Sequence, residues 1–88
     1  MLITLTTDFG NSSPYVAAMK GVILSINPAV TIVDISHSIG AQNIFEGAFV
    51  LGEATRWFPA GTIHVAVVDP GVGTSRRIVC VECDGQFY

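Results

Sequence analysis

The segment Leu2-Ile3-Thr4-Leu5-Thr6, followed by Thr7-Asp8-Phe9-Gly10, decides the fold of this chain. Its aliphatic and β-branched residues favour a short strand over residues 2–6 that ends at an acidic turn. Ser13-Pro14 then predicts a helix start, because serine accepts hydrogen bonds from free N–H groups and proline suits the first helical position. The helix over residues 14–26 should end before Pro28, since the residue preceding a proline is disfavoured in helical geometry.

The same alternation of strand and helix continues along the chain. Asn43 with Glu46 three residues later resembles a capping box and opens a helix that runs to about Trp57. Asp84-Gly85 predicts a hairpin turn into a last strand. Three further strands are expected over residues 30–34, 62–68 and 77–83. Strands separated by helices imply a mainly parallel sheet flanked by helices, an α/β, Rossmann-like fold with right-handed crossovers.

The composition indicates that these residues do not form a complete domain. Half of the 88 residues are apolar and only 12% are charged, against about 25% charged in an ordinary soluble domain. Both predicted helices are apolar nearly all round, which is typical of helices covered on more than one face. We therefore expect residues 1–88 to be a partial α/β domain, the N-terminal portion of a larger one, and the stop at Tyr88 within a hairpin agrees with this.

Several classes of protein are disfavoured by the same numbers. No apolar stretch approaches the roughly 20 residues that span a bilayer, and the first residues show no basic leader followed by a cleavage site. A net charge of −3 with four basic residues argues against a nucleic-acid partner. Two cysteines are too few for a disulfide framework. We expect a cytoplasmic protein with no membrane and no nucleic-acid partner.

Acidic residues follow three of the predicted strands. Asp8, Asp34 and Asp69 stand at or just after strand ends, and the carboxyl ends of parallel strands lie at one edge of the sheet, where open α/β folds bind ligands. The alternative is that aspartate is simply common in turns and caps. His37 follows the second strand and is a candidate for a supporting role near this edge, whereas His64, inside the third strand, is expected to be a core or interface residue.

An ordered set of short motifs carries a family resemblance. They are Thr7-Asp8-Phe9-Gly10, Tyr15-Val16, Met19-Lys20-Gly21, Val33-Asp34-Ile35-Ser36-His37, Phe58-Pro59-Ala60-Gly61-Thr62, Val68-Asp69-Pro70-Gly71-Val72-Gly73-Thr74 and Arg76-Arg77. In this order and spacing, the chain resembles the S-adenosylmethionine hydroxide adenosyltransferases, hydrolases related to the fluorinating and chlorinating enzymes. The resemblance implies attack of water or hydroxide on the ribose C5′ of S-adenosylmethionine, which expels methionine and leaves adenosine. It implies no cofactor and no metal.

The resemblance also implies roles for particular residues. Asp69 matches the water-handling aspartate and Arg76 its partner arginine, so these two are the expected catalytic residues. Asp8 matches the aspartate that holds the ribose, and Phe9 and Ser13 are grouped with it as substrate-binding residues. Relatives usually carry aspartate where Ser13 stands, so the contact to the methionine amino group should differ here. In the family, a downstream histidine and a C-terminal β domain from a neighbouring subunit of a homotrimer complete the site, and neither lies in these residues.

Two alternatives stay open at this point. One is a halogenase with the same substrate, although Asp69 with Arg76 favours water, because a carboxylate beside a halide repels it. The other is a non-catalytic, truncated module that binds adenosine-like ligands.

Overall fold

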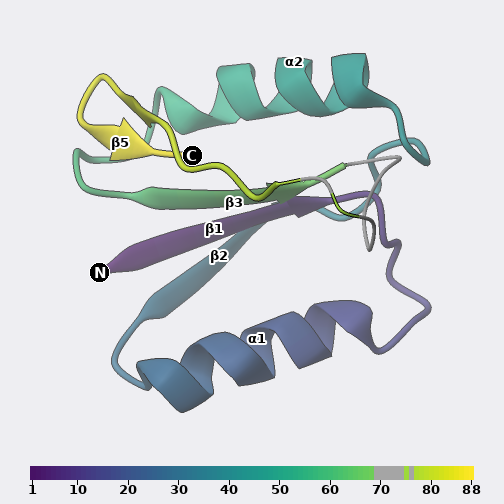
Figure 1. The fold of residues 1–88 in the computed structure, drawn as a ribbon, viewed down its shortest axis with the longest axis horizontal. Helices are drawn as coiled ribbons and strands as arrows, with labels where there is room; N and C mark the ends of the chain where they lie inside the picture. Colours follow the sequence, from purple (N-terminus) through teal and green to yellow (C-terminus); the bar gives the residue numbers. More distant parts are fainter. Residues whose placement is uncertain (69–74, 76) are drawn as a thin grey trace.

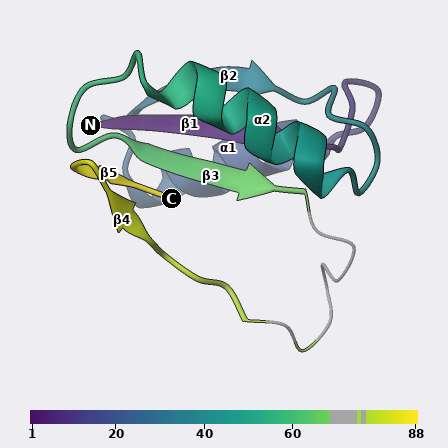
Figure 2. The same cartoon turned by 90° about the horizontal axis from the view of Figure 1, so that it is seen from above.

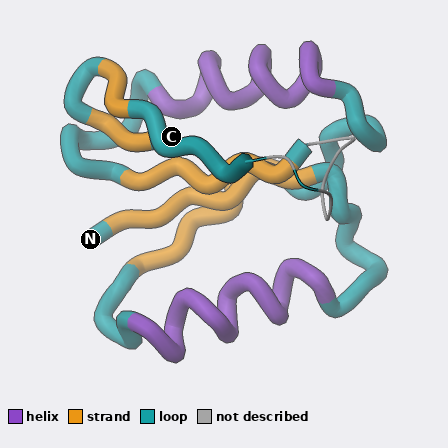
Figure 3. Tube along the Cα trace, in the orientation of Figure 1, coloured by secondary structure: helices purple, strands orange, loops and turns teal. Residues whose placement is uncertain are grey.

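The computed structural model describes residues 1–68, 75 and 77–88 and shows a sheet flanked by two helices (Figures 1 and 3). The elements are β1 (Leu2–Thr7), α1 (Tyr15–Ile26), β2 (Thr31–Ser36), α2 (Ile44–Thr55), β3 (Ile63–Val67), β4 (Glu82–Cys83) and β5 (Gln86–Phe87). Both predicted helices and the first three predicted strands are present, whereas the predicted strand over residues 77–83 is reduced to β4.

The sheet has the order β2-β1-β3-β5-β4, with β1 parallel to both β2 and β3. Figure 2 shows these three strands running in the same direction. β5 pairs in parallel with β3, and the short β4 closes an antiparallel hairpin at the edge. The chain moves from β1 to one neighbour and then crosses back to the other, and α1 and α2 lie on opposite faces of the sheet (Figure 1). The predicted α/β fold with a mainly parallel sheet is confirmed.

The start of α1 differs from the prediction in its capping residue. Pro14 is the N-cap, with no side-chain cap hydrogen bond, and the helix begins at Tyr15. The hydroxyl of Ser13 is buried and has no hydrogen-bond partner among the residues that the structure describes. The prediction that Ser13 caps the helix is therefore wrong. The end of α1 is as predicted, because Asn27 leaves the helical region immediately before Pro28.

The start of α2 uses half of the predicted capping box. The Asn43 side chain accepts a hydrogen bond from the Glu46 N–H at 3.0 Å, as the motif predicts. The Glu46 carboxylate does not return to Asn43 and accepts instead from the Gly40 N–H at 2.7 Å. The helix ends at Thr55, and hydrogen-bonded turns rather than helix carry the chain past Trp57.

The predicted strand over residues 77–83 is mostly absent, since only Glu82–Cys83 is strand. Val81 exchanges two backbone hydrogen bonds with Tyr88, each 2.8 Å long, whereas Ile78 and Val79 are exposed. β-branched residues favour a strand only when a neighbouring strand and a packed face receive them. The hairpin turn itself is confirmed, because Asp84 and Gly85 both have positive φ, the geometry of the tight turns that suit hairpins.

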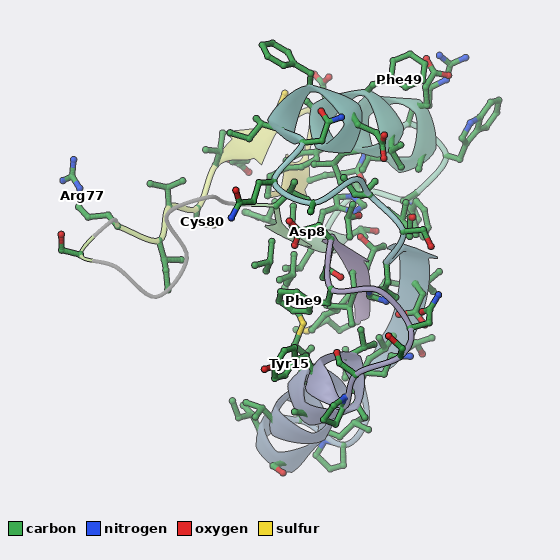
Figure 4. The ribbon with its side chains drawn as sticks, turned by 90° about the vertical axis from the view of Figure 1, so that its right-hand side faces the viewer. Asp8, Phe9, Tyr15, Phe49, Arg77 and Cys80 are labelled. Carbon is green, nitrogen blue, oxygen red and sulfur yellow. The ribbon has the colours of Figure 1, made fainter. Side chains whose placement is uncertain are left out.

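The buried residues gather on the central strand rather than under the helices. Thr4, Leu5, Thr6 and Thr7 of β1 are fully buried, whereas no residue of α1 is buried. On α2, Phe45 and Phe49 are 89% and 69% exposed and Trp57 beyond it is 78% exposed; Figure 4 shows Phe49 pointing away from the sheet. Contiguous exposed apolar surface of this kind marks an interaction face.

Candidate functional site

The carboxyl ends of the three parallel strands form one edge of the sheet. Thr7 pairs with Val67 at the end of β1 and β3, and the Asp8 N–H contacts the Val67 carbonyl at 3.4 Å. The Gly10 N–H donates to the carbonyl of His37, just beyond β2, at 2.8 Å. β1 lies between the strand that follows it and the strand reached by crossing back, so this edge is a topological switch point, where open α/β sheets bind ligands.

Asp8 stands at the switch point and is only partly buried. Its Oδ2 accepts a hydrogen bond from the Gln42 backbone N–H at 2.7 Å. Gln42 has φ of 56°, a left-handed conformation that non-glycine residues seldom adopt. A carboxylate has about four acceptor positions, so the bond to Gln42 fixes the direction of Asp8 and leaves acceptor capacity for a ligand.

The loop that carries Gln42 is held by its own hydrogen bonds. The Asn43 N–H donates to the Gly40 carbonyl at 2.9 Å, and the Gly40 N–H donates to the Glu46 carboxylate at 2.7 Å. Glu46 lies in the first turn of α2, where the helix dipole favours a negative charge. The loop between β2 and α2 is thus held at both sides: Glu46 in the first turn of α2 binds its Gly40 N–H, and Asp8 binds its Gln42 N–H.

A second group of polar side chains lies beside Asp8 on the face that α1 covers. The buried His37 bonds through Nδ1 to the Thr7 hydroxyl at 2.8 Å and through Nε2 to Asp34 Oδ1 at 2.8 Å. Lys20 of α1 donates to the other Asp34 oxygen at 2.7 Å. A continuous set of hydrogen bonds therefore runs from the surface of α1 to the end of β1.

Asp34 is the acidic member of this set, and it forms an ion pair with Lys20. The Lys20 ammonium, and after it His37, hold the pKa of Asp34 below its ordinary value of 3.8, against a smaller opposing effect of burial. An ionised carboxylate only accepts hydrogen bonds, so His37 donates from Nε2. The neutral form of His37 then accepts at Nδ1 from the Thr7 hydroxyl.

An apolar groove of about 500 Å³ adjoins the same edge between α1 and the sheet. Phe9 and Tyr15 stand at its edge with their rings at 71° and centroids 5.9 Å apart, and both are labelled in Figure 4. Its other lining residues are Ala18, Met19, Val22, Ile23 and Val65. Phe9, predicted to bind substrate, thus joins the carboxylate of Asp8 to an apolar surface.

The structure places the predicted site residues only in part. Asp8 and Phe9 meet at the switch point, and Ser13 lies in the segment before α1 with its hydroxyl buried. Asp69 and Arg76 lie outside the described residues, so their predicted roles are not tested.

Gln42 is a site residue that the sequence analysis missed. Its contact with Asp8 joins residues 34 positions apart, and no local motif marks it. Across the part of the chain that is described, no group of three or more His, Cys, Asp or Glu residues is arranged to hold a metal ion. In that same part, neither helix has the length and apolar character needed to cross a membrane.

The fold defines the class, a doubly wound α/β domain, and domains of this class generally bind ligands at the carboxyl ends of their parallel strands. Residues 3–88 match the family model for the SAM (S-adenosylmethionine) hydroxide adenosyltransferase N-terminal domain. The chain belongs to this family, as the motif order predicted.

Relatives in the family have two kinds of activity by name. A (R)-S-adenosyl-L-methionine hydrolase of Methanocaldococcus jannaschii is 48% identical over 91 residues, covering 99% of this chain and 34% of the relative. A fluorinase of an Actinoplanes species is 39% identical over 80 residues, covering 91% of the chain and 27% of the relative. The chain thus spans about a third of the length of the curated relatives it matches.

A solved structure shows the same fold in a longer protein. A conserved protein from Thermotoga maritima, described as uncharacterized, superposes with a TM-score of 0.91 at 40% identity. The match covers 99% of this chain and 34% of that one.

Proposed function

We propose that the protein to which these residues belong hydrolyses S-adenosylmethionine to adenosine and methionine. The observation that carries the proposal is Asp8, a partly exposed carboxylate held at the switch point of the sheet by the Gln42 N–H at 2.7 Å. Family membership and a relative named as an S-adenosylmethionine hydrolase support the choice of substrate.

Asp8 suits the recognition of a ribose. A carboxylate accepts from two neighbouring hydroxyls at once, and such charge-assisted hydrogen bonds are stronger than neutral ones. Holding both hydroxyls fixes the sugar and therefore the position of its C5′ carbon. Phe9 adjoins an apolar groove of about 500 Å³, and apolar walls exclude water from a site.

The chemistry suits a nucleophile presented in a dry pocket. Oxygen forms a bond to C5′ while the C–S bond breaks, and the electron pair of that bond stays on sulfur. Methionine leaves as a neutral thioether, so the positive charge of the sulfonium is lost, and exclusion of water favours this step when the nucleophile has anionic character. In-line placement of the oxygen at near-attack distance supplies the rest.

Asp69 and Arg76 are proposed to handle the attacking water. Asp69 takes a proton from the water and Arg76 stabilises its hydroxide character. This part of the proposal rests on the match of Asp69-Pro70-Gly71-Val72-Gly73-Thr74 and Arg76 to the family pattern.

Halogenation is the second candidate, and the 39% identical fluorinase favours it. Its nucleophile would be a halide, which a carboxylate at position 69 would repel. The pair Asp69 and Arg76 therefore favours water.

The site is proposed to be completed by parts outside these 88 residues. We propose a downstream histidine and a C-terminal β domain contributed by a neighbouring subunit of a homotrimer, and no cofactor. The exposed aromatic residues on α2 are compatible with such an assembly. Light scattering of the complete gene product would measure its mass, and a monomer would contradict the trimer.

The cytoplasmic location stays a prediction, which cell fractionation would test.

The decisive experiment follows adenosine and methionine release by the complete gene product. Asp69→Asn and Arg76→Ala should abolish turnover, whereas Asp8→Asn, which keeps an oxygen for Gln42, should chiefly raise KM for S-adenosylmethionine. Asp84→Asn in the hairpin removes the same charge far from the switch point and should change neither the turnover rate nor KM.

Normal turnover by Asp69→Asn would refute the assignment of the base. Binding without turnover by the wild type would favour a non-catalytic module, and halide-dependent formation of a 5′-halogenated nucleoside would favour halogenation.

A further inference from the structure

Three hydrogen bonds join His37 to the turn that carries Asp8. His37 Nδ1 lies 2.8 Å from the Thr7 hydroxyl, and that hydroxyl accepts from the Phe9 N–H at 3.2 Å. The Gly10 N–H donates to the His37 carbonyl at 2.8 Å. The residues before and after Asp8 are therefore both tied to one histidine.

The direction of these bonds is fixed from the surface inward. Asp34 is ionised, since Lys20 contacts it at 2.7 Å, so it accepts from His37 Nε2. In its neutral form, His37 then accepts from the Thr7 O–H, and the Thr7 oxygen keeps a lone pair for the Phe9 N–H. Each bond in the set then has one donor and one acceptor, and for neutral His37 only the tautomer with its proton on Nε2 allows this.

We propose that His37 is a positioning residue that, through Thr7, sets the direction in which Asp8 faces the ribose. The inference rests on the proposed function, because it deepens the role given there to Asp8. Within the described residues, Thr7 has no exposed surface and His37 is 6% exposed. Neither side chain is therefore placed to contact the ribose directly. Their effect reaches the ligand through the backbone of the turn.

A matched pair of residues on the same strand separates positioning from stability. Thr4 of β1 is also fully buried and also bonds to a buried histidine, His64, with Thr4 Oγ1 at 2.6 Å from Nδ1. Thr4 lies in the middle of β1, paired with Val33 and His64, and makes no contact with the turn. Thr4→Val and Thr7→Val thus remove the same kind of hydrogen bond at different distances from Asp8.

The experiment compares the two variants in the complete gene product. Thr7→Val should raise KM for S-adenosylmethionine about 10- to 100-fold, because small displacements of a positioning group cost that much, and should raise the exchange rates of the Phe9 and Gly10 amides. Thr4→Val should leave KM and these exchange rates unchanged, although it lowers the melting temperature as much. Equal changes of KM in both variants, or unchanged exchange of the Phe9 amide in Thr7→Val, would overturn the proposal.

Two substitutions of His37 test its two side-chain hydrogen bonds separately, because each variant keeps one of them and loses the other. In His37→Asn the amide oxygen lies near the former Nδ1 and still accepts from Thr7, whereas in His37→Gln the amide nitrogen lies near the former Nε2 and still donates to Asp34. We expect His37→Asn to keep KM closer to the wild type than His37→Gln does. The reverse order would overturn the action through Thr7.

Failure of the proposed function gives a different result. If the wild type releases no adenosine, hydrolysis is refuted, and the exchange rates of the Phe9 and Gly10 amides still decide whether Thr7 and His37 hold the turn. If the wild type is active and the valine variants are alike in KM, only the positioning role of His37 is refuted.

Discussion

The two buried histidines of this domain, His37 and His64, make the same kind of hydrogen bond through Nδ1 but have different partners at Nε2. His37 and His64 each bond through Nδ1 to a threonine of β1, Thr7 and Thr4 respectively. The two threonines are three residues apart on the strand, so their side chains point to opposite faces of the sheet. α1 and α2 lie on opposite faces of the sheet (Figure 1). Lys20 of α1 bonds to the Asp34 that holds His37, and Thr55 of α2 bonds to the Gln86 that holds His64.

The partners of the His64 ring are a hydroxyl and an amide, with no carboxylate or ammonium group among them. Nε2 lies 2.6 Å from Gln86 Oε1, and the Gln86 amide donates to the Thr55 carbonyl at 3.0 Å. Tyr88 stacks on the ring at 4.9 Å and Phe58 meets it edge to face at 5.6 Å. The cluster joins β1, β3, β5 and the end of α2. Thr4, His64 and Gln86 are buried, whereas Phe58 and Tyr88 are half-buried.

The His37 cluster ends instead in charge at the surface. Asp34 and Lys20 are 41% and 34% exposed at their side chains, while His37 itself is buried. Burial of a histidine therefore does not distinguish a supporting role at a site from a role in the core. The distinction lies in the partner of the second ring nitrogen, Nε2. For His64 this partner is the buried Gln86 amide, and for His37 it is the ion pair of Asp34 and Lys20.

Replacing each histidine by leucine should give the largest difference between the clusters. His64→Leu leaves the Thr4 hydroxyl and the Gln86 Oε1 buried without a hydrogen-bond partner, and we expect a loss of about 3 kcal/mol in the free energy of unfolding. His37→Leu should cost less, about 1 to 2 kcal/mol, since only the Thr7 hydroxyl loses a partner in a buried position, whereas Asp34 and Lys20 remain solvated. Urea unfolding of the complete gene product measures both. Equal losses would show that the His37 cluster is as closed as the other.

Replacing Gln86, the partner of His64 Nε2, by glutamate should lower the free energy of unfolding by less than His64→Leu does. Gln86→Glu keeps the acceptor for His64 Nε2 but brings an oxygen to the Thr55 carbonyl in place of the amide donor. We expect a loss of about 2 kcal/mol at pH 7. Burial raises the pKa of the new carboxyl, so its protonated form donates to Thr55 and the loss should shrink as the pH falls. A loss that does not depend on pH between about 5 and 7 would contradict a dry cluster.

The sequence predicted the fold where local chemistry decides it. The β-branched run of β1, the proline after α1 and the pair Asp84-Gly85 each specify backbone geometry within a few residues. The first three strands and both helices were therefore expected within a few residues of their bounds, and so was the meeting of strand ends that places Asp8 at the switch point.

Features that depend on distant partners were not predictable. Gln42 reaches Asp8 across 34 positions, and the Glu46 carboxylate reaches Gly40 instead of the Asn43 backbone. The β-branched residues Ile78 and Val79 suggested a strand, yet a strand needs a neighbour, which no sequence pattern names. His64 was correctly expected to be buried, and the position of His37 after the second strand suggested a supporting role near the edge, although its partners Thr7 and Gly10 were not predicted.

Removing the charge of Asp34 should give the smallest effect and tests whether the His37 cluster is open to solvent. Lys20 and then His37 lower the pKa of Asp34 from its ordinary value of 3.8, so the ionised form stabilises the folded state above that pH, and the contribution is lost as the pH falls through the lowered pKa. Because both side chains are a third or more exposed, Asp34→Asn should cost only about 0.5 kcal/mol at pH 7.

The dependence of this small effect on pH and salt identifies its origin. The difference between Asp34→Asn and the wild type should vanish as the pH falls through the lowered pKa of Asp34, and high salt at pH 7 should reduce it, because screening weakens exposed ion pairs. Glu53→Gln removes the same charge from an exposed position on α2 and serves as the control for net charge. A loss above about 2 kcal/mol at pH 7 that persists in high salt would mean that the Asp34 carboxylate is shielded from water. The two histidine clusters would then differ in charge but not in their access to solvent.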